Sequence, residues 1–201
     1  MPKIINFEGL HGSGKTTQAK LLEFRLKSNG FNVEYICSAD KPLSKYGMNF
    51  LKDCGTQTPE TLFFLSLANN AAIQDRIKNY SGDIIILDRY IYTDIASTLA
   101  AKKDRNWIYD CLTPFILPDI AFLIDITSEE ALQRKNGISS KLEKGYYQNT
   151  KTDNNFLEYQ NMIKNAYSQI CSYDKNLIKI DGSMNIQNIH SQILSHLEKI
   201  L

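Results

Sequence analysis

The sequence has almost no net charge, no closely spaced cysteine pair and no long apolar run, and each absence excludes a class of protein. A net charge of +1 creates no global field for a polyanion such as nucleic acid, so any phosphate must be bound by local groups. The four cysteines form no C-x-x-C pair, which favours reduced thiols in a cytoplasmic protein. No run approaches the ~20 apolar residues of a membrane span, and no signal peptide precedes the first predicted strand. We therefore expect neither a nucleic-acid partner nor a membrane partner.

What is present is the composition of an ordinary globular protein, with 43% hydrophobic and 22% charged residues. The 201 residues contain no internal repeat, low-complexity tract or linker, so we expect one domain over residues 1–201. Short apolar runs alternate with helical stretches, and the runs 83–88 and 119–125 are almost entirely apolar inside, which is typical of strands buried on both faces. The alternation predicts an α/β fold with a doubly wound, five-stranded parallel sheet flanked by helices.

The predicted strands are Lys3–Glu8, Asn32–Cys37, Asp83–Asp88, Asp119–Asp125 and Asn176–Asp181. The predicted helices are Thr16–Asn29, Thr58–Asn79, Tyr92–Lys102, Trp107–Leu112, Ser128–Lys135, Asn155–Tyr173 and Ile186–Leu201.

A glycine-rich segment follows the first predicted strand. Residues 9–16 read Gly-Leu-His-Gly-Ser-Gly-Lys-Thr, which completes the pattern G-x-x-x-x-G-K-[ST], and a good helix former follows. Strand, glycine-rich turn and helix are the context in which backbone N–H groups and a helix N-terminus hold phosphate. Lys15 is then placed to reach β and γ phosphates, and the Thr16 hydroxyl to bind Mg²⁺.

A second charged segment, Asp88-Arg89-Tyr90, follows the third predicted strand, at the strand end where ligands collect in such sheets. Asp88 is placed to hold Mg²⁺ directly or through water, and Arg89 to grip an acceptor phosphate as a planar bidentate donor. Alone, this pair reads as a surface Asp–Arg pair; beside a phosphate-binding loop, the functional interpretation is favoured. Glu8 is the last residue of the first strand, and two interpretations of it stay open: a contact to substrate or Mg²⁺, and a plain strand-end charge.

Two further features concern the surroundings of the loop. His11 lies inside it and is expected to face solvent; its reference pKa of about 6.5 fits a general base, although phosphoryl transfer does not require one. The basic stretch 133–151 contains two glycines and is typical of a lid that closes over phosphates and excludes water, with a solvated basic loop as the alternative. The cations of this stretch are Arg134, Lys135, Lys141, Lys144 and Lys151.

Together these motifs resemble those of thymidylate kinases, a branch of the nucleoside monophosphate kinases. Residues 7–18 are similar to the family's opening signature almost throughout, and residues 88–90 to its second signature. Residues 131–134 and 141–143 occupy the place of its lid, and residues 180–182 with the terminal helix resemble its adenine-side loop and last helix. The resemblance implies a P-loop kinase fold, ATP and Mg²⁺ as cofactors, dTMP or a related nucleotide as the acceptor, and a homodimer.

The resemblance also implies roles for individual residues. Lys15, Asp88, Arg89 and Arg134 would be the catalytic residues, with Arg134 in the lid or on the adenine side. Thr16 and Asp88 would hold Mg²⁺. The residues that would bind ATP are Gly9, His11, Gly12, Ser13, Gly14, Lys15, Thr16 and Thr17.

The sequence departs from the family pattern on the acceptor side. His11 stands where the family has Asp, and residues 37–42 lack the Arg that grips the acceptor phosphate, leaving Lys41 as a point charge. In the lid, Ser140-Lys141 stands for an Asp-Arg pair. We therefore expect a well-matched half for the phosphoryl donor and an altered half for the acceptor.

The helix from residue 58 departs as well. Ser66 and Asn70 stand where the family has an aromatic that stacks on thymine and an Arg that reads it, with Phe63 and Phe64 nearby. Two other hypotheses therefore stay open: a kinase of deoxynucleosides or another small metabolite, and a nucleotide-binding protein without kinase activity. ADP release that depends on one particular acceptor separates the three.

Overall fold

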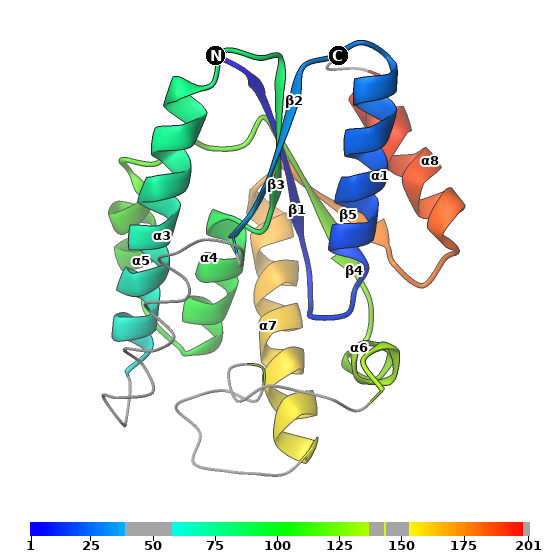
Figure 1. Cartoon of the computed structure of the whole chain (residues 1–201). Helices are drawn as coiled ribbons and strands as arrows, with labels where there is room; N and C mark the ends of the chain where they lie inside the picture. Colours follow the sequence, from blue (N-terminus) through cyan, green and yellow to red (C-terminus); the bar gives the residue numbers. More distant parts are fainter. Residues whose placement is uncertain (39–57, 137–142, 144–152, 199–201) are drawn as a thin grey trace.

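The apolar runs form five parallel strands of one sheet. The computed structural model describes residues 1–38, 58–136, 143 and 153–198. The strand order is β2-β3-β1-β4-β5, so each connection returns the chain to the same end of the sheet and the fold is doubly wound, as predicted (Figure 1). The strands are β1 Lys3–Glu8, β2 Val33–Cys37, β3 Ile84–Asp88, β4 Ile120–Asp125 and β5 Leu177–Asp181.

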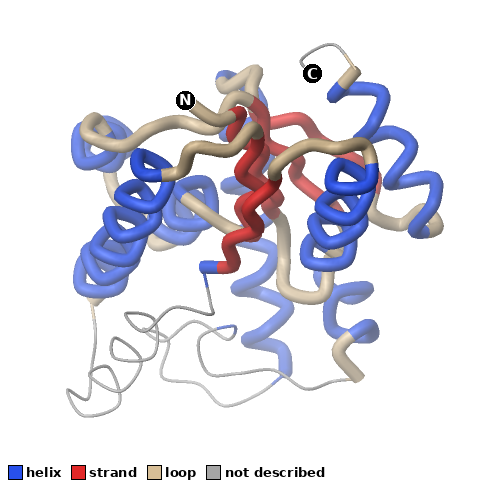
Figure 2. Tube along the Cα trace, turned by 45° about the horizontal axis from the view of Figure 1, so that its top comes forward, coloured by secondary structure: helices blue, strands red, loops and turns tan. Residues whose placement is uncertain are grey.

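Helices cover both faces of this sheet, and the three central strands β1, β3 and β4 are therefore buried along almost their whole length. Helices α3, α4, α5 and α7 lie over one face and α1 and α8 over the other, while α6 follows β4 (Figures 1 and 2). Along β1, Ile4 points into the first core and Ile5 into the second, which is the alternation of a pleated strand. The helices are α1 Lys15–Ser28, α3 Pro59–Asn79, α4 Ile91–Ala100, α5 Arg105–Leu112, α6 Ser128–Arg134, α7 Asp153–Tyr173 and α8 Ile186–Leu197.

Helix starts follow local hydrogen-bonding chemistry. Thr58 caps α3 by accepting from the backbone N–H of Thr61, with Pro59 in the first turn as expected. Helix α6 begins at Ser128, as predicted, and its capping residue is Thr127, whose hydroxyl accepts from the Glu130 backbone N–H while the Glu130 carboxylate accepts from the Thr127 backbone N–H. This reciprocal pair satisfies two N–H groups that a helix start otherwise leaves unpaired.

The strand register gathers the charged strand ends at one edge of the sheet. Phe7 pairs with Asp88 of β3 on one side and with Phe122 of β4 on the other. Glu8 and Asp88 therefore end at the same edge, which we call the carboxyl edge. None of the helices in the described ranges is long and apolar enough to cross a bilayer.

Candidate functional site

The loop between β1 and α1 has a backbone that glycine alone adopts without strain. Gly12 has φ 85° and Gly14 has φ 100°, both in the left-handed region. A Cβ at Gly12 would also come within 2.9 Å of the Ala131 carbonyl oxygen. The loop is thus a tight turn pressed against α6, with the N-terminus of α1 directly behind it. Such a turn presents N–H groups to an anion.

Lys15 lies buried beneath this loop, with 6% of its surface exposed. Its Nζ donates to the Leu10 carbonyl oxygen at 2.8 Å. Burial, followed by the positive charge of Arg89, lowers the pKa of Lys15 to about 7. The ammonium is therefore poorly compensated in this structure, and negative phosphate oxygens are the groups that would stabilise it.

Thr16 and Asp88 meet at the start of α1. The Thr16 hydroxyl donates to Asp88 Oδ2 at 2.5 Å, and the Tyr35 hydroxyl donates to the same oxygen at 2.9 Å. A hydroxyl and a carboxylate are oxygen ligands of the kind that Mg²⁺ prefers. The described residues contain no group of three or more metal-ligating side chains, so this pair offers part of a magnesium shell. Sequence reasoning missed Tyr35, which stands in β2 two residues before its end.

Arg89 is positioned by a buried network around Glu8. Its φ of 69° turns the chain sharply after β3, and its guanidinium donates to the Thr93 hydroxyl at 3.0 Å. Thr93 in turn donates to Glu8 Oε2 at 2.5 Å. Glu8 also accepts from the Tyr90 backbone N–H at 2.9 Å and from the Tyr167 hydroxyl at 3.1 Å. Burial raises the pKa of Glu8, and these donors oppose that shift.

Glu8 is therefore more than a strand-end charge, because it fixes the residues around Arg89. The sequence left its role open, and it gave no sign of Thr93 or Tyr167. Glu8 and Tyr167 are 159 positions apart, so only the packing of α7 against α4 brings them together.

His11 is exposed to solvent, as expected, and it also contacts a residue from outside the loop. Its side chain is half-exposed, but its Nδ1 lies 2.8 Å from a carboxylate oxygen of Glu143, which also contacts Lys135. The Glu143 backbone is held by Gln160 of α7 at 2.8 Å. Desolvation, together with Arg89, lowers the pKa of His11 to about 4, so the ring is neutral near pH 7.

Arg134 joins the loop to the turn after β5. Its guanidinium donates to the Ser13 carbonyl oxygen at 3.3 Å and to the Gly182 carbonyl oxygen at 2.8 Å. A hollow of about 490 Å³ lies beside it, with polar loop atoms on one wall and apolar side chains on another. Its lining residues are Gly12, Ser13, Gly14, Thr17, Gln18, Arg134, Met184, Asn185, Ile186, Gln187 and Ile189. The predicted lid cations Lys141, Lys144 and Lys151 lie outside the described residues.

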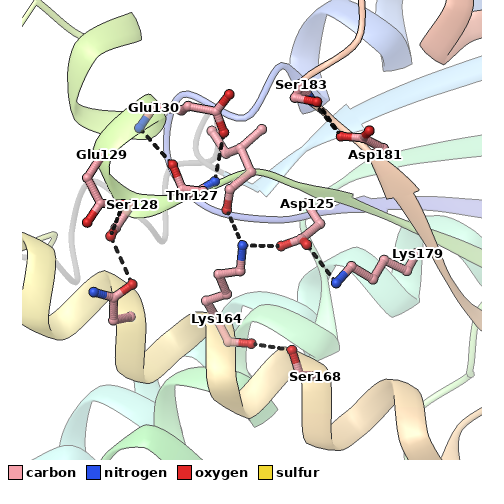
Figure 3. Close-up of polar contacts among 12 residues, drawn as sticks. Asp125, Thr127, Ser128, Glu129, Glu130, Lys164, Ser168, Lys179, Asp181 and Ser183 are labelled. Carbon is pink, nitrogen blue, oxygen red and sulfur yellow. Dashed lines mark hydrogen bonds and ion pairs between the residues drawn. The ribbon is translucent and has the colours of Figure 1, made fainter.

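The elements that carry Arg134 and its partners are held by ion pairs (Figure 3). Asp125, at the end of β4, contacts Lys164 of α7 at 3.2 Å and Lys179 of β5 at 2.7 Å. Lys164 also donates to the Ile126 carbonyl oxygen at 3.0 Å. In the turn after β5, Ser183 donates to Asp181 through both its backbone and its hydroxyl. These contacts fix the position of α6 relative to the hollow.

The acceptor side shows a different arrangement from the family pattern. Asn70 of α3 is buried and donates through Nδ2 to Asp94 of α4 at 2.6 Å, and Ser66 also hydrogen-bonds to Asp94. Phe63 is buried against Trp107, with ring centroids 5.3 Å apart, and Phe64 is exposed beside the same ring. Lys41 and Ser140 lie outside the described residues.

Comparisons with known proteins agree with this geometry. The sequence model of the family "Thymidylate kinase" matches residues 7–193. A probable thymidylate kinase of Sulfurisphaera tokodaii is 35% identical over 134 residues, which cover 67% of this chain and 69% of that protein. The thymidylate kinase of Plasmodium falciparum is 30% identical over 206 residues, covering 98% and 90%. The solved thymidylate kinase of Candida albicans, at 24% identity, superposes with a TM-score of 0.74 over 98% of this chain and 92% of that one, so the two share a fold. The chain belongs to the thymidylate kinase family.

Proposed function

We propose that the chain transfers the γ-phosphoryl group of MgATP to dTMP. The observation that carries this proposal is the meeting of Lys15, Thr16, Asp88 and Arg89 at the carboxyl edge, from two segments that are 72 residues apart. Family membership supports a phosphotransferase, because the relatives are named for the same reaction. A loop cation, an oxygen pair for Mg²⁺ and a second cation are the parts that phosphoryl transfer uses.

On the donor side, the loop N–H groups and the α1 N-terminus hold the ATP phosphates. We assign this binding to Gly9, His11, Gly12, Ser13, Gly14, Lys15, Thr16 and Thr17. Lys15 exchanges its contact with the Leu10 carbonyl for the phosphates, which restores its charge. The adenine ring enters the hollow between Arg134 and the apolar side chains of α8, where a flat apolar ligand is complementary.

The residues present fit a magnesium ion. Thr16 and Asp88 supply two oxygen ligands, and the phosphates and water supply the rest, which is the usual arrangement for Mg²⁺ at a nucleotide site. When bound, the ion neutralises phosphate charge that develops during transfer. Tyr35 keeps the Asp88 carboxylate oriented by donating to the same oxygen that meets Thr16.

On the acceptor side, Arg89 binds the dTMP phosphate and orients one phosphate oxygen toward the γ-phosphorus of ATP. That oxygen forms the new bond while the bond to the β–γ bridging oxygen breaks, leaving ADP and dTDP. Glu8 and Thr93 hold Arg89 in place, which turns a flexible side chain into a preorganised donor. No general base is needed, because the attacking phosphate already carries negative charge.

We further propose that residues 1–201 form one kinase domain with a lid at about 133–151, and that two copies form a homodimer. The anchoring of Arg134 and Glu143 against the loop supports the lid. The dimer rests on the family alone, and light scattering coupled to size exclusion measures it. A monomer at micromolar concentration would contradict it.

The proposed reaction is tested by ADP release from MgATP with a panel of acceptors. The panel holds the common nucleoside monophosphates and the free deoxynucleosides. We expect strong turnover with dTMP and none with thymidine. Turnover only with a free nucleoside, or ATP binding without any acceptor-dependent ADP release, would reject the proposal.

A further inference from the structure

His11 pairs with a buried carboxylate, and the proposed reaction gives its ring no chemical task. His11 Nδ1 lies 2.8 Å from Glu143 Oε1, and only 5% of the Glu143 side chain is exposed. Lys135, directly after α6, contacts the same oxygen. Gln160 of α7 donates to the Glu143 backbone carbonyl oxygen at 2.8 Å. The carboxylate that meets His11 is therefore held in place from α6 and from α7.

This pair decides which ring nitrogen of His11 is available to a ligand. An ionised carboxylate only accepts hydrogen bonds, and the cation of Lys135 on the same oxygen favours the ionised form. The shared proton is therefore the Nδ1 proton of His11, and in a neutral ring Nε2 then carries a lone pair. The side chain is 48% exposed, and in the part of the chain that the structure describes its hydrogen bond to Glu143 leaves Nε2 unused.

His11 also stands next to the cation that binds the transferring phosphate in the proposed reaction. Lys15 Nζ donates at 2.8 Å to the Leu10 carbonyl oxygen, which belongs to the peptide bond that joins Leu10 to His11. Lys15 and Arg89 are both close enough for their charges to act on the imidazole. A phosphoryl group bound between these two cations is therefore beside the ring.

A neutral imidazole that a carboxylate holds in one orientation has the properties of a nucleophile. Histidine is one of the side chains that form covalent intermediates, and a nucleophile whose orientation is fixed by a second group is the usual arrangement. Its lone pair carries no proton, so attack on phosphorus requires no base. The remaining requirements of phosphoryl transfer are position and neutralised charge, which the loop and its cations supply.

We propose that His11 is a phosphorylation site, which the chain modifies itself with MgATP when no acceptor nucleotide is bound. Nε2 forms a bond to the γ-phosphorus while the bond from that phosphorus to the β–γ bridging oxygen breaks, and the electron pair leaves with ADP. The Nδ1 proton stays between His11 and Glu143, whose carboxylate offsets the positive charge of the phosphorylated ring. This inference rests on the proposed function, because it uses the same bound ATP.

Two properties of the modified chain follow from this chemistry. A phosphorylated imidazole is itself a reactive phosphoryl donor, so ADP bound in the loop takes the group back and forms ATP. The modification also adds negative charge to a loop that binds phosphate, so the modified chain should bind ATP less tightly. An acceptor such as dTMP competes with His11 for the same phosphoryl group and should reduce the modification.

The test is labelling of the full chain by MgATP with a radioactive γ-phosphate, without an acceptor, at about pH 8, where the ring is neutral. The reaction is stopped with alkali, because phosphohistidine survives alkali and is hydrolysed in acid. We expect label with these two properties, and tandem mass spectrometry of an alkaline digest should place it on His11. Unlabelled MgADP should remove the label and return it to ATP.

Three variants test the pair. His11→Asn should abolish the label, and if this variant does not fold, the position of the label in the wild type decides. Glu143→Gln should lower the rate of labelling about tenfold, because a neutral amide holds the Nδ1 proton less strongly than a carboxylate does. The matched control is His190→Asn, which removes a half-buried histidine of α8 outside the loop and should label like the wild type.

Four outcomes would overturn the inference: no label, label on another residue, label that MgADP does not remove, and a wild-type rate of labelling in Glu143→Gln. Turnover of dTMP alongside any of these would leave the proposed function intact. Label on His11 without turnover of dTMP would do the reverse, supporting this inference and rejecting the proposed acceptor.

Discussion

The donor half and the acceptor half of the site are built in different ways. The donor half is one contiguous segment, residues 9–17, whose backbone N–H groups and glycine conformations create the phosphate cradle. The acceptor half is assembled from side chains of β1, α3, α4 and α7 around Arg89. A contiguous backbone cradle tolerates little change, whereas a distributed set of side chains changes one contact at a time. This difference explains why the donor motif matches its family almost throughout, with His11 as its one departure, while Ser66 and Asn70 on the acceptor side both depart from it.

The largest expected effect comes from removing the lysine cation of the donor half. Lys15→Ala should lower kcat by about 10³-fold, because it removes a preorganised cation from the transferring phosphoryl group. The fold should survive, since the hydrogen bond described for this side chain goes only to the Leu10 carbonyl of the loop itself. The measurement is ADP release with dTMP, with circular dichroism as the check on folding. Lys20→Ala is the control on the same helix, where the cation lies over the Tyr35 ring, and should keep turnover.

The second effect separates the halves. Arg89→Ala should lower kcat/KM for dTMP by about a hundredfold, because two charge-assisted hydrogen bonds to phosphate are lost at about 1.5–3 kcal/mol each before compensation. The Kd of ADP, measured by calorimetry, should stay near the wild-type value. If the Kd of ADP rises by the same factor as kcat/KM for dTMP falls, the two halves act as one coupled unit.

A third, smaller effect tests how a residue outside the loop contributes to nucleotide binding in the donor half. Arg134→Ala should weaken ADP binding by about tenfold, because it removes the link between the Ser13 and Gly182 carbonyls beside the hollow. The KM for dTMP should hardly change. If the KM for dTMP rises by as much as the Kd of ADP, Arg134 contacts both substrates.

The smallest effect concerns His11, a residue of the donor loop. With its pKa lowered to about 4, the ring should stay neutral down to about pH 5, since only below that does the charged form grow. Phosphates that neutralise Arg89 and Lys15 should raise this pKa. Proton NMR of the ring signals, without and with MgADP and dTMP, measures both values. A ring that titrates near pH 6.5 in the free protein would contradict the desolvation of His11 beside Arg89.

Much of the fold could be predicted, because local patterns dictate it. The runs 84–88 and 120–124 are apolar on both faces, and only a sheet with helices over both of its faces buries both sides of such strands. The start of α6 at Ser128 was predictable for the same reason, because the reciprocal contact between Thr127 and Glu130 that caps it spans only three residues.

The residues of the candidate site likewise divide into those that a local motif fixes and those that depend on packing. Lys15 and Thr16 could be placed because their motif fixes their geometry within eight residues. Glu8 could not be assigned, because its partners Thr93 and Tyr167 are 85 and 159 residues away. The contact of His11 with Glu143 likewise depends on how α7 packs beside the loop.

The sequence by itself determined the parallel sheet, the phosphate-binding loop and the family, because continuous apolar runs and a glycine-rich motif are local patterns. Only the tertiary structure decided what Glu8, Asp94 and Arg134 touch, because these partners come from separate elements whose packing sets the distances. The altered acceptor side belongs to this second group. Ser66 and Asn70 were visible as departures from a pattern, but only the packing of α3 against α4 showed that both contact Asp94.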